Sequence, residues 1–286
     1  MAHAASDDSW GVHVNVTREM LRLSALLLVL LVLFGSIERL WPVRRQPLVR
    51  QAFGIDVAYY FLSGMLPKFA LLLAMSMLAA ILHQFDVYQD LYEAVAAWPV
   101  ALRLGVAVIV GEMGAYWGHR LSHQIPWLWR FHVIHHSSQE IDWLVNTRAH
   151  PVDLLFTRLC GYVPLYLLGL AQPSSNSVDL VPLLVSLLGT VWGFFIHANL
   201  RWRFGPLEWL VSTPAFHHWH HTLSNHINKN YAAMLPLVDK LFGTLYLPKA
   251  WPAKYGTDTP VPDTMAAQLL EPLQPEQASQ PLVPHG

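Results

Sequence analysis

The sequence predicts an all-α fold: a polytopic membrane helical bundle of about four to five spans with a histidine-rich helical cap on its cytoplasmic face. Apolar residues make up 53% of the 286 residues and charged residues only 13%, whereas about a quarter of the residues of a soluble domain are charged. Several apolar runs approach the length of a bilayer-crossing helix. Twelve of the sixteen histidines lie between His119 and His226, which predicts a metal-binding cap beside the spans.

The N-terminal half supplies the first two spans. Residues 1–20 form a mostly polar segment without the apolar core of a secretory signal peptide, so the apolar run that follows is expected to be retained. Residues 21–37 are just long enough to cross a hydrocarbon core, which needs about 20 helical residues. Residues 53–82 form a longer run with Pro67 near its middle, so they are either one kinked helix or a span joined to a shorter interfacial piece. Residues 21–99 are therefore interpreted as the N-terminal membrane spans.

Residues 100–255 are interpreted as a histidine-rich catalytic membrane domain. Its first run, residues 100–117, leads directly into the first histidine cluster, so the site is expected to begin at a membrane face. Runs at 154–170 and 178–196 flank the short polar sequence QPSSNS (172–177), which predicts an antiparallel helical hairpin. The remaining residues, 256–286, form a C-terminal tail that is rich in proline and glutamine at its end and is expected to be flexible there.

Basic residues predict the orientation of the bundle. Four arginines follow the first run: Arg39, Arg44, Arg45 and Arg50. The connection at 85–94 between the second and third runs carries acids only. Because loops rich in lysine and arginine stay in the cytoplasm, the 39–50 loop and the histidine clusters are expected on the cytoplasmic face, with the N-terminus outside.

Composition excludes several other classes of function. The net charge of −1 and the dispersed basic residues give no field for nucleic acid. The single cysteine, Cys160, lies in an apolar stretch and is interpreted as an inert thiol, not as a disulfide or a metal site. The sequence contains no HExxH motif of zinc proteases and no GxGxxG or P-loop motif. Electrons for any redox reaction are therefore expected from a separate donor protein.

Most histidines of this region fall into three clusters: HRLSH (119–123), HVIHH (132–136) and HHWHH (217–221). Residues three or four apart lie on one face of a helix, so each cluster directs at least two imidazoles to one side. Imidazole is a common ligand of transition metals, and many buried rings without partners would each cost about 1–3 kcal/mol. The spacing therefore predicts a multinuclear metal site.

Other residues near the clusters are assigned by context. His197 closes the run at 178–196, and His150 is either a ligand or a residue that starts a helix. His218 is expected to point away from the other histidines of its cluster, and His226 to lie in a loop. Glu112 lies two helical turns before His119, and an acid within a span is a functional candidate. The alternatives are that it pairs with Arg103 or faces a water-filled cavity. The four remaining histidines carry no functional assignment: His3, His13, His83 and His285.

The order HxxxH, HxxHH, hydrophobic hairpin and HxxHH resembles the fatty acid hydroxylase superfamily, which includes sterol desaturases, sphingolipid hydroxylases and alkylglycerol monooxygenase. The likeness extends from about residue 118 to 255. It includes RAHP (148–151), FIHAN (195–199), TPAFHHWHHT (213–222) and NKNYAAMLPLVDKLFGTLYLP (228–248). The resemblance implies a site with two iron ions held by histidines alone, with dioxygen as co-substrate and zinc as an ion that the isolated protein can carry.

The resemblance also implies roles for individual residues. Eight histidines match the family's ligand motifs and are expected to be catalytic: His119, His123, His132, His135, His136, His217, His220 and His221. His197 matches a further family ligand in its FxHxN context, and His150 is included as a candidate metal ligand. No residues are assigned to an organic cofactor. The implied electron donor is a protein of the cytochrome b5 or ferredoxin type.

The expected function is that of a membrane-bound non-haem diiron oxygenase that hydroxylates or desaturates a lipid with dioxygen and two electrons. Sterol, fatty acyl and sphingoid substrates all remain open, and so does the choice between hydroxylation and desaturation, because the ligands are shared. Two alternatives stay open. A zinc-dependent membrane hydrolase would use a metal-bound water and usually a carboxylate base. A metal transporter or sensor would spread its histidines through the depth of the bilayer.

Overall fold

The computed structural model describes residues 16–171 and 180–274, and within them it is a bundle of helices without a β-sheet. The elements follow in this order: α1 (Val16–Leu40), α2 (Phe53–Leu82), α3 (Asp86–Ala96), α4 (Val100–Gln124), α5 (Pro126–His136), η1 (Trp143–Thr147), α6 (Pro151–Leu167), α7 (Leu180–His197), η2 (Gly205–Trp209), α8 (Pro214–His220), α9 (Pro236–Leu241), α10 (Met265–Leu270) and η3 (Glu271–Leu273). The prediction of an all-α bundle is confirmed.

Four of these helices are long and apolar enough to cross a membrane: α1, α2, α4 and α7. Large apolar side chains point outward from them, including Val29 on α1, Leu73 on α2 and Leu187 on α7, each at least half exposed. Such an apolar outer surface fits a bilayer, since a soluble bundle would place polar residues there. Helix α6 has 17 residues and is shorter than these four. The expected range of about four to five spans agrees with this count.

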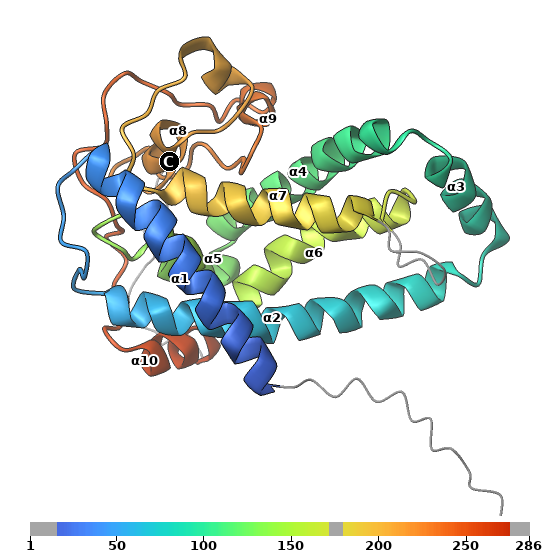
Figure 1. The fold of residues 1–286 in the computed structure, drawn as a ribbon, viewed down its shortest axis with the longest axis horizontal. Coiled ribbons are helices and arrows are strands. Elements are labelled where there is room, and N and C mark those ends of the chain that lie inside the picture. The colour runs from blue at the N-terminus through green and yellow to red at the C-terminus, as the bar shows by residue number, and fades with distance from the viewer. Residues whose placement is uncertain (1–15, 172–179, 275–286) are drawn as a thin grey trace, which may run out of the picture.

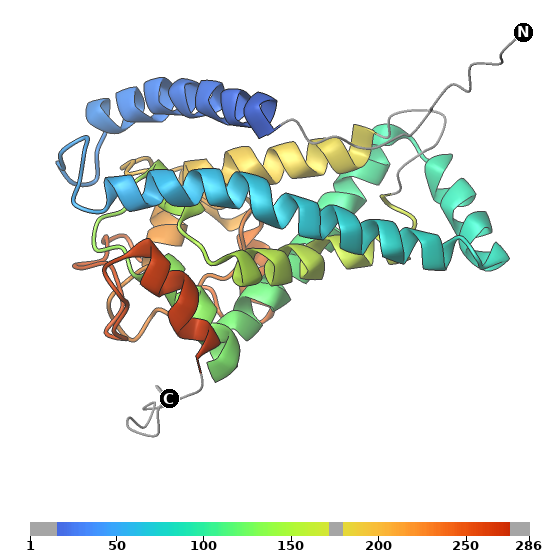
Figure 2. The ribbon, with the colours of Figure 1, turned by 90° about the horizontal axis from the view of Figure 1, so that it is seen from below.

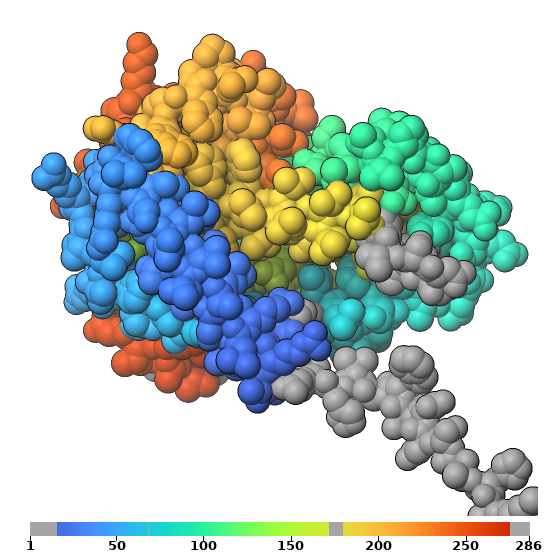
Figure 3. Space-filling view, in the orientation of Figure 1, coloured from blue at the N-terminus to red at the C-terminus, as the bar shows by residue number. Residues whose placement is uncertain are grey.

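The elements are arranged so that the histidine-bearing ones meet at one end of the bundle. Helices α5 and α8 gather at one end, together with α10, whereas α3 lies at the opposite end (Figures 1 and 2). Helix α1 crosses the face formed by α2 and α7, as the space-filling view shows (Figure 3). The predicted histidine-rich helical cap is therefore present.

Helices α4 and α6 pack closely against each other. A side-chain Cβ at Gly114 would lie 2.0 Å from the carbonyl oxygen of Cys160, and one at Gly118 would lie 2.8 Å from the Cys160 Cβ. Glycine at these two positions lets the backbones approach, as small residues do in membrane helix pairs. The contact fixes the middle of α6, at Thr157 and Cys160, against the part of α4 that leads into the first histidine cluster.

A buried network of two arginines and two aspartates connects the start of α2 with η1. The Arg50 Nε donates to Asp142 Oδ2 at 2.7 Å, and the Arg148 Nε donates to Asp56 Oδ1 at 2.5 Å. Arg50 also pairs with Asp56. Asp142 in turn caps η1 by accepting from the backbone N–H groups of residues 144 and 145. The network balances two positive and two negative charges in a buried place, where an unpaired ion would be costly.

Several details differ from the sequence-based expectations or decide between them. The run 53–82 is one helix with Pro67 inside it, not two pieces. The acid-only connection expected at 85–94 contains helix α3, which buries Tyr88 and Val95. Helix α3 was not predicted because it is only 11 residues long and mixes apolar with charged residues. The QPSSNS turn, residues 1–15 of the polar segment and residues 275–286 of the tail lie outside the described residues.

Candidate metal centre

Nine histidines from four helices converge into two groups whose candidate ligand atoms lie within 4.8 Å of one another in each group. The first histidine group consists of His119, His123, His132, His136 and His220. The second histidine group consists of His135, His197, His217 and His221. In both groups the residues are histidines alone, and the eight histidines expected from the motifs are all present, together with His197.

Helical spacing sorts the histidines between the groups. In α4, His119 and His123 are four apart and share the first group. In α5, His132 and His136 are four apart and join them, whereas His135 faces the second group. At the end of α8, His217 and His221 are four apart and belong to the second group. Because positions four apart share a helix face, α4 presents its histidines to the first group alone, whereas α5 and the end of α8 each present one edge to each group.

The two groups are in direct contact. The rings of His136 and His221, one from each group, are stacked with centroids 4.6 Å apart. The rings of His217 and His220 are also stacked, at 5.3 Å. This closeness allows two metal ions held by the two groups to act on one small molecule.

Oxygen acceptors fix the orientation of most of these rings through their Nδ1 atoms. Four Nδ1 atoms donate to backbone carbonyls: His119 to Tyr231 at 2.7 Å, His135 to Arg148 at 3.0 Å, His197 to Gly193 at 2.7 Å and His220 to Lys229 at 2.8 Å. The His132 Nδ1 donates to Asp153 Oδ2 at 3.0 Å. A carbonyl or carboxylate oxygen only accepts, so in each neutral ring the proton is on Nδ1 and the Nε2 lone pair is free.

The free Nε2 lone pairs point at one another. The Nε2 atoms of His119 and His132 are 3.1 Å apart, and those of His135 and His197 are 3.2 Å apart. Neither member of these pairs has a proton to share while the rings are neutral, so the pairs repel unless a cation lies between them. The buried Nε2 atoms of His123 and His220 have no hydrogen-bond partner among the described residues. These features fit a site that holds metal ions.

Burial keeps the rings outside the spans neutral. It lowers the pKa of His135, His136 and His217 well below the ordinary value, and the neighbouring imidazoles lower it further. The same causes lower the pKa of His220 and His221. A histidine must be deprotonated at the coordinating nitrogen to bind a metal. At neutral pH these five rings are therefore ready to act as ligands.

Buried carboxylates hold the side chains and backbone around the two histidine groups in position. Asp153 accepts from the Ser122 Oγ at 3.2 Å as well as from His132. Asp239 accepts from the backbone N–H groups of Tyr231 and Ala232, both at 2.8 Å, and so holds the carbonyl that orients His119. Glu112, a functional candidate from sequence, accepts from the N–H groups of residues 234 and 235 instead of contacting the histidines. It positions the loop that carries the Tyr231 carbonyl.

The three remaining histidines between His119 and His226 lie outside both groups. His150 caps the start of α6, where its Nδ1 accepts from the Val152 N–H at 3.1 Å, and its Nε2 lies 3.2 Å from the Leu269 carbonyl oxygen. The structure therefore does not bring it to the nine histidines, and it fits the alternative role of a residue that starts a helix. His218 bonds with Tyr255 and the Ala198 carbonyl, and His226 is stacked on Tyr246 in a loop.

Sequence reasoning missed the backbone acceptors. The carbonyls of Arg148, Gly193, Lys229 and Tyr231 orient four rings, yet a carbonyl is present in every residue and leaves no signal in a sequence. The ion network around Arg148 was also missed, because its members are separated by up to 92 residues. Asp153 and Asp239 lie near the clusters in the sequence, but spacing alone identifies no partner for either acid.

Four candidate spanning helices with nine convergent histidines at one end define the class: an integral membrane protein with a histidine-rich candidate metal centre. The sequence model of the fatty acid hydroxylase family matches residues 104–244, a range that contains all nine histidines. The chain belongs to the fatty acid hydroxylase superfamily, as its motifs predicted.

Curated relatives are lipid hydroxylases and monooxygenases. The chain is 37% identical over 181 residues to ornithine lipid hydroxylase OlsE of Rhizobium tropici, a match that covers 61% of this chain and 51% of that protein. It is 33% identical over 165 residues to alkylglycerol monooxygenase of Danio rerio, covering 57% and 35%. Methylsterol monooxygenase 2-2 of Arabidopsis thaliana is 28% identical over 138 residues, covering 48% and 49%. The chain thus spans about half of the first relative and a third of the second. No solved structure matches it significantly.

Proposed function

We propose that this protein is a membrane-bound non-haem diiron oxygenase that hydroxylates a lipid with dioxygen and electrons from a separate donor. The observation that carries the proposal is the pair of adjacent histidine groups with converging Nε2 atoms. The first histidine group would hold one iron and the second histidine group the other. Zinc also binds imidazole sites strongly, so the isolated protein can carry zinc in place of iron.

The protein supplies the positions and the charge state of the ligands. When bound, two iron ions supply the redox chemistry that splits dioxygen, with two electrons and two protons needed to convert a C–H bond and O2 into C–OH and water. The carbonyls of Tyr231 and Arg148 keep the Nδ1 protons of His119 and His135, so their Nε2 atoms stay free for metal. Because these imidazoles are neutral, they would add no negative charge to the ions that they hold.

The named activities of the relatives support a lipid substrate and favour hydroxylation over desaturation. The three proteins carry names of lipid hydroxylases or monooxygenases acting on ornithine lipid, alkylglycerol and methylsterol. The apolar outer surface of α1, α2 and α7 lets a membrane lipid reach the bundle from the side. We therefore propose a membrane lipid as substrate, and a redox protein of the cytochrome b5 or ferredoxin type as electron donor.

We also propose that the centre faces the cytoplasm. The loop of residues 41–52 and the C-terminal end of α7 lie at the same end of the bundle as α5 and α8 (Figure 1). Three of the loop's residues are arginines, and Arg39 lies in the last turn of the preceding helix. The positive-inside rule places such an end in the cytoplasm.

The two alternative functions have less support. A zinc hydrolase usually needs a carboxylate base beside its metal, whereas the two groups among the described residues consist of histidine alone and Asp153 is occupied by His132 and Ser122. A transporter would spread its ligands through the bilayer, whereas these ligands gather at one end.

The decisive experiment measures oxygen consumption and lipid products with iron-reconstituted protein in membranes and a reductant. His135→Ala and His220→Ala each remove one ring from one histidine group, and His226→Ala is the control outside both groups. We expect oxygenated lipid with wild type and His226→Ala and a loss of at least tenfold in both other variants. Oxygen-independent turnover with zinc would support the hydrolase and contradict the proposal.

A further inference from the structure

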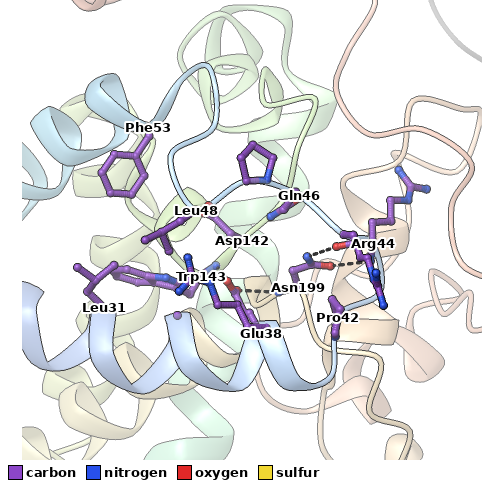
Figure 4. Close-up of a pocket in the computed structure, with 14 residues that line it drawn as sticks. Leu31, Glu38, Pro42, Arg44, Gln46, Leu48, Phe53, Asp142, Trp143 and Asn199 are labelled. Atoms are coloured by element: carbon purple, nitrogen blue, oxygen red, sulfur yellow. Dashed lines mark hydrogen bonds between the residues drawn. The ribbon is translucent and has the colours of Figure 1, made fainter.

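A cavity of about 290 Å³ opens between the end of α1, the loop after it and the start of η1 (Figure 4). Its lining is divided by polarity. Leu31, Leu48 and Phe53 lie at one end, and Arg44 and Asn199 lie at the other (Figure 4). None of its lining residues belongs to the two histidine groups, so the cavity is a separate site.

The polar part of the cavity presents an incompletely used carboxylate. The Glu38 Oε1 accepts from the backbone N–H groups of Trp143 at 2.9 Å and of Asn199 at 2.8 Å. The second oxygen of Glu38, Oε2, takes no hydrogen bond from the described part of the chain, and it is not among the fully enclosed polar atoms. Glu38 is thus held in place by one oxygen while the other is left for a ligand. Burial disfavours the charged form of this carboxyl group, and a cationic ligand would favour it again by supplying the opposite charge.

Two guanidinium groups line the same cavity without an ion pair among the described residues. They are Arg39 and Arg45, and both are exposed. Arg44 is different, because its guanidinium donates to the Ala253 carbonyl and lies over the Tyr255 ring. The free pair can bind an anionic group such as phosphate or carboxylate, for which arginine has the matching donor geometry.

The apolar part follows the direction of the spanning helix. Leu31 precedes Glu38 by two helical turns of α1, about 10 Å along the axis, and α1 is one of the four candidate spans. The cavity therefore runs from the charged end of a span toward its apolar middle. A ligand that fills it needs a polar head and an apolar tail, which is the description of a membrane lipid.

We infer that this cavity binds the headgroup of a zwitterionic membrane lipid, with the ammonium group at Glu38, the anionic group at Arg39 and Arg45, and the first part of the tail along Leu31 and Phe53. The ammonium would add a partner to the free carboxylate oxygen of Glu38. The two arginines would exchange solvent for phosphate or carboxylate oxygens, and the remaining lining would cover methylene groups.

The cavity is coupled to the metal centre through shared elements. Asn199, whose N–H is held by Glu38, follows the second-group ligand His197 by two residues. Trp143, the other partner of Glu38, begins η1, and the Arg148 that follows η1 supplies the carbonyl for His135. The inference deepens the proposed function by naming a substrate class, and its link to turnover rests on that function. The binding of a lipid in this cavity does not depend on the oxygenase function.

The test measures lipid binding to the detergent-solubilised full chain by native mass spectrometry. The probes are phosphatidylethanolamine, with an ammonium and a phosphate; Nα-palmitoyl-lysine, with an ammonium and a carboxylate; and phosphatidylglycerol, with a phosphate alone. The variants are Glu38→Gln and the double variant Arg39→Ala with Arg45→Ala. Glutamine retains an oxygen that can accept from residues 143 and 199, so the fold is preserved. Arg201→Ala removes an exposed arginine outside the cavity and is the matched control.

We expect Glu38→Gln to weaken binding of the two ammonium lipids about tenfold, the loss of one charge-assisted hydrogen bond, and to leave phosphatidylglycerol binding unchanged. The double variant should weaken binding of all three lipids by a similar factor, and Arg201→Ala should change none. The ammonium lipid that binds more tightly identifies the anionic group as phosphate or carboxylate. Equal binding of all three lipids, unaffected by Glu38→Gln, would overturn the inference.

The same variants separate this inference from the oxygenase proposal. If binding shows the expected pattern while iron-loaded protein forms no oxygenated lipid, the oxygenase proposal fails and the headgroup site stands. If oxygenated lipid forms with equal efficiency in Glu38→Gln, the double variant and wild type, the headgroup site is rejected as a substrate site and the oxygenase proposal stands.

Discussion

The Nδ1 atom of His132 lies 3.0 Å from Oδ2 of Asp153, and both side chains are buried. This contact joins α5 to α6 and turns the His132 Nε2 toward His119. Asp153 also accepts from Ser122 on α4. One carboxylate thus connects the three helices around the first histidine group and fixes the tautomer of one of its ligands.

Asp153 therefore offers a test of metal binding. We expect Asp153→Ala to lower the metal affinity of the first histidine group by about 10–100-fold, since outer partners of ligand histidines contribute that much. Asp153→Asn keeps an oxygen that can accept from Nδ1 and should have a smaller effect. Chelator competition monitored by metal analysis measures the affinity. Asp90→Asn, on an exposed position of α3, is the control, and unchanged affinity in Asp153→Ala would contradict the assignment.

The two histidine groups should lose metal separately. Wild type is expected to bind two metal ions per chain, and His136→Ala and His217→Ala, one from each group, should each reduce this to about one. The double variant should bind none tightly. Metal content after purification and dialysis gives the result. A single variant that loses both ions would show that the groups form one inseparable site.

His150 should behave as a structural residue. Because its Nδ1 accepts the Val152 N–H at the start of α6, His150→Ala is expected to cost about 1 kcal/mol of stability, the usual loss for a helix N-cap. Metal content should stay at the wild-type level. Thermal unfolding in detergent and metal analysis on the same sample test both parts. Loss of a metal ion in His150→Ala would restore it to the ligand set.

The close contact of α4 and α6 should not tolerate a methyl group. Gly114→Ala places a Cβ 2.0 Å from the Cys160 carbonyl oxygen and is expected to destabilise the protein by about 1–3 kcal/mol, as overpacking does. Gly105→Ala in the same helix meets nothing within 4 Å and should be neutral or slightly stabilising. The two midpoints of thermal unfolding are compared. Equal midpoints would show that the helices can separate without cost.

The buried ion network should be sensitive to the loss of one acid. Asp56→Asn leaves Arg50 and Arg148 with one carboxylate between them, and breaking such a buried pair costs about 3–5 kcal/mol. A shift of Arg148 would also displace the carbonyl that orients His135. We expect a lower unfolding midpoint and reduced metal content in the second histidine group. A wild-type midpoint would show that water replaces the missing charge.

The sequence by itself determined the class of fold and the histidine composition of the candidate site. Apolar runs reveal spanning helices because a bilayer demands about 20 apolar residues in succession. Histidine spacing reveals shared helix faces because the helical repeat is a local property of the chain. The histidines of all three clusters could therefore be named without knowing how the helices pack.

The tertiary structure decided everything that depends on residues far apart in the chain. Spacing could not show that His132 and His135 serve different groups, because that choice depends on how α5 crosses α4 and α8. Spacing could not separate His197 from His150 either. His150 precedes an apolar helix and His197 ends one, but only His197 lies where the other histidines meet. The cavity at Glu38 likewise exists only where α1 meets η1 and the end of α7, since long-range packing, not local periodicity, creates it.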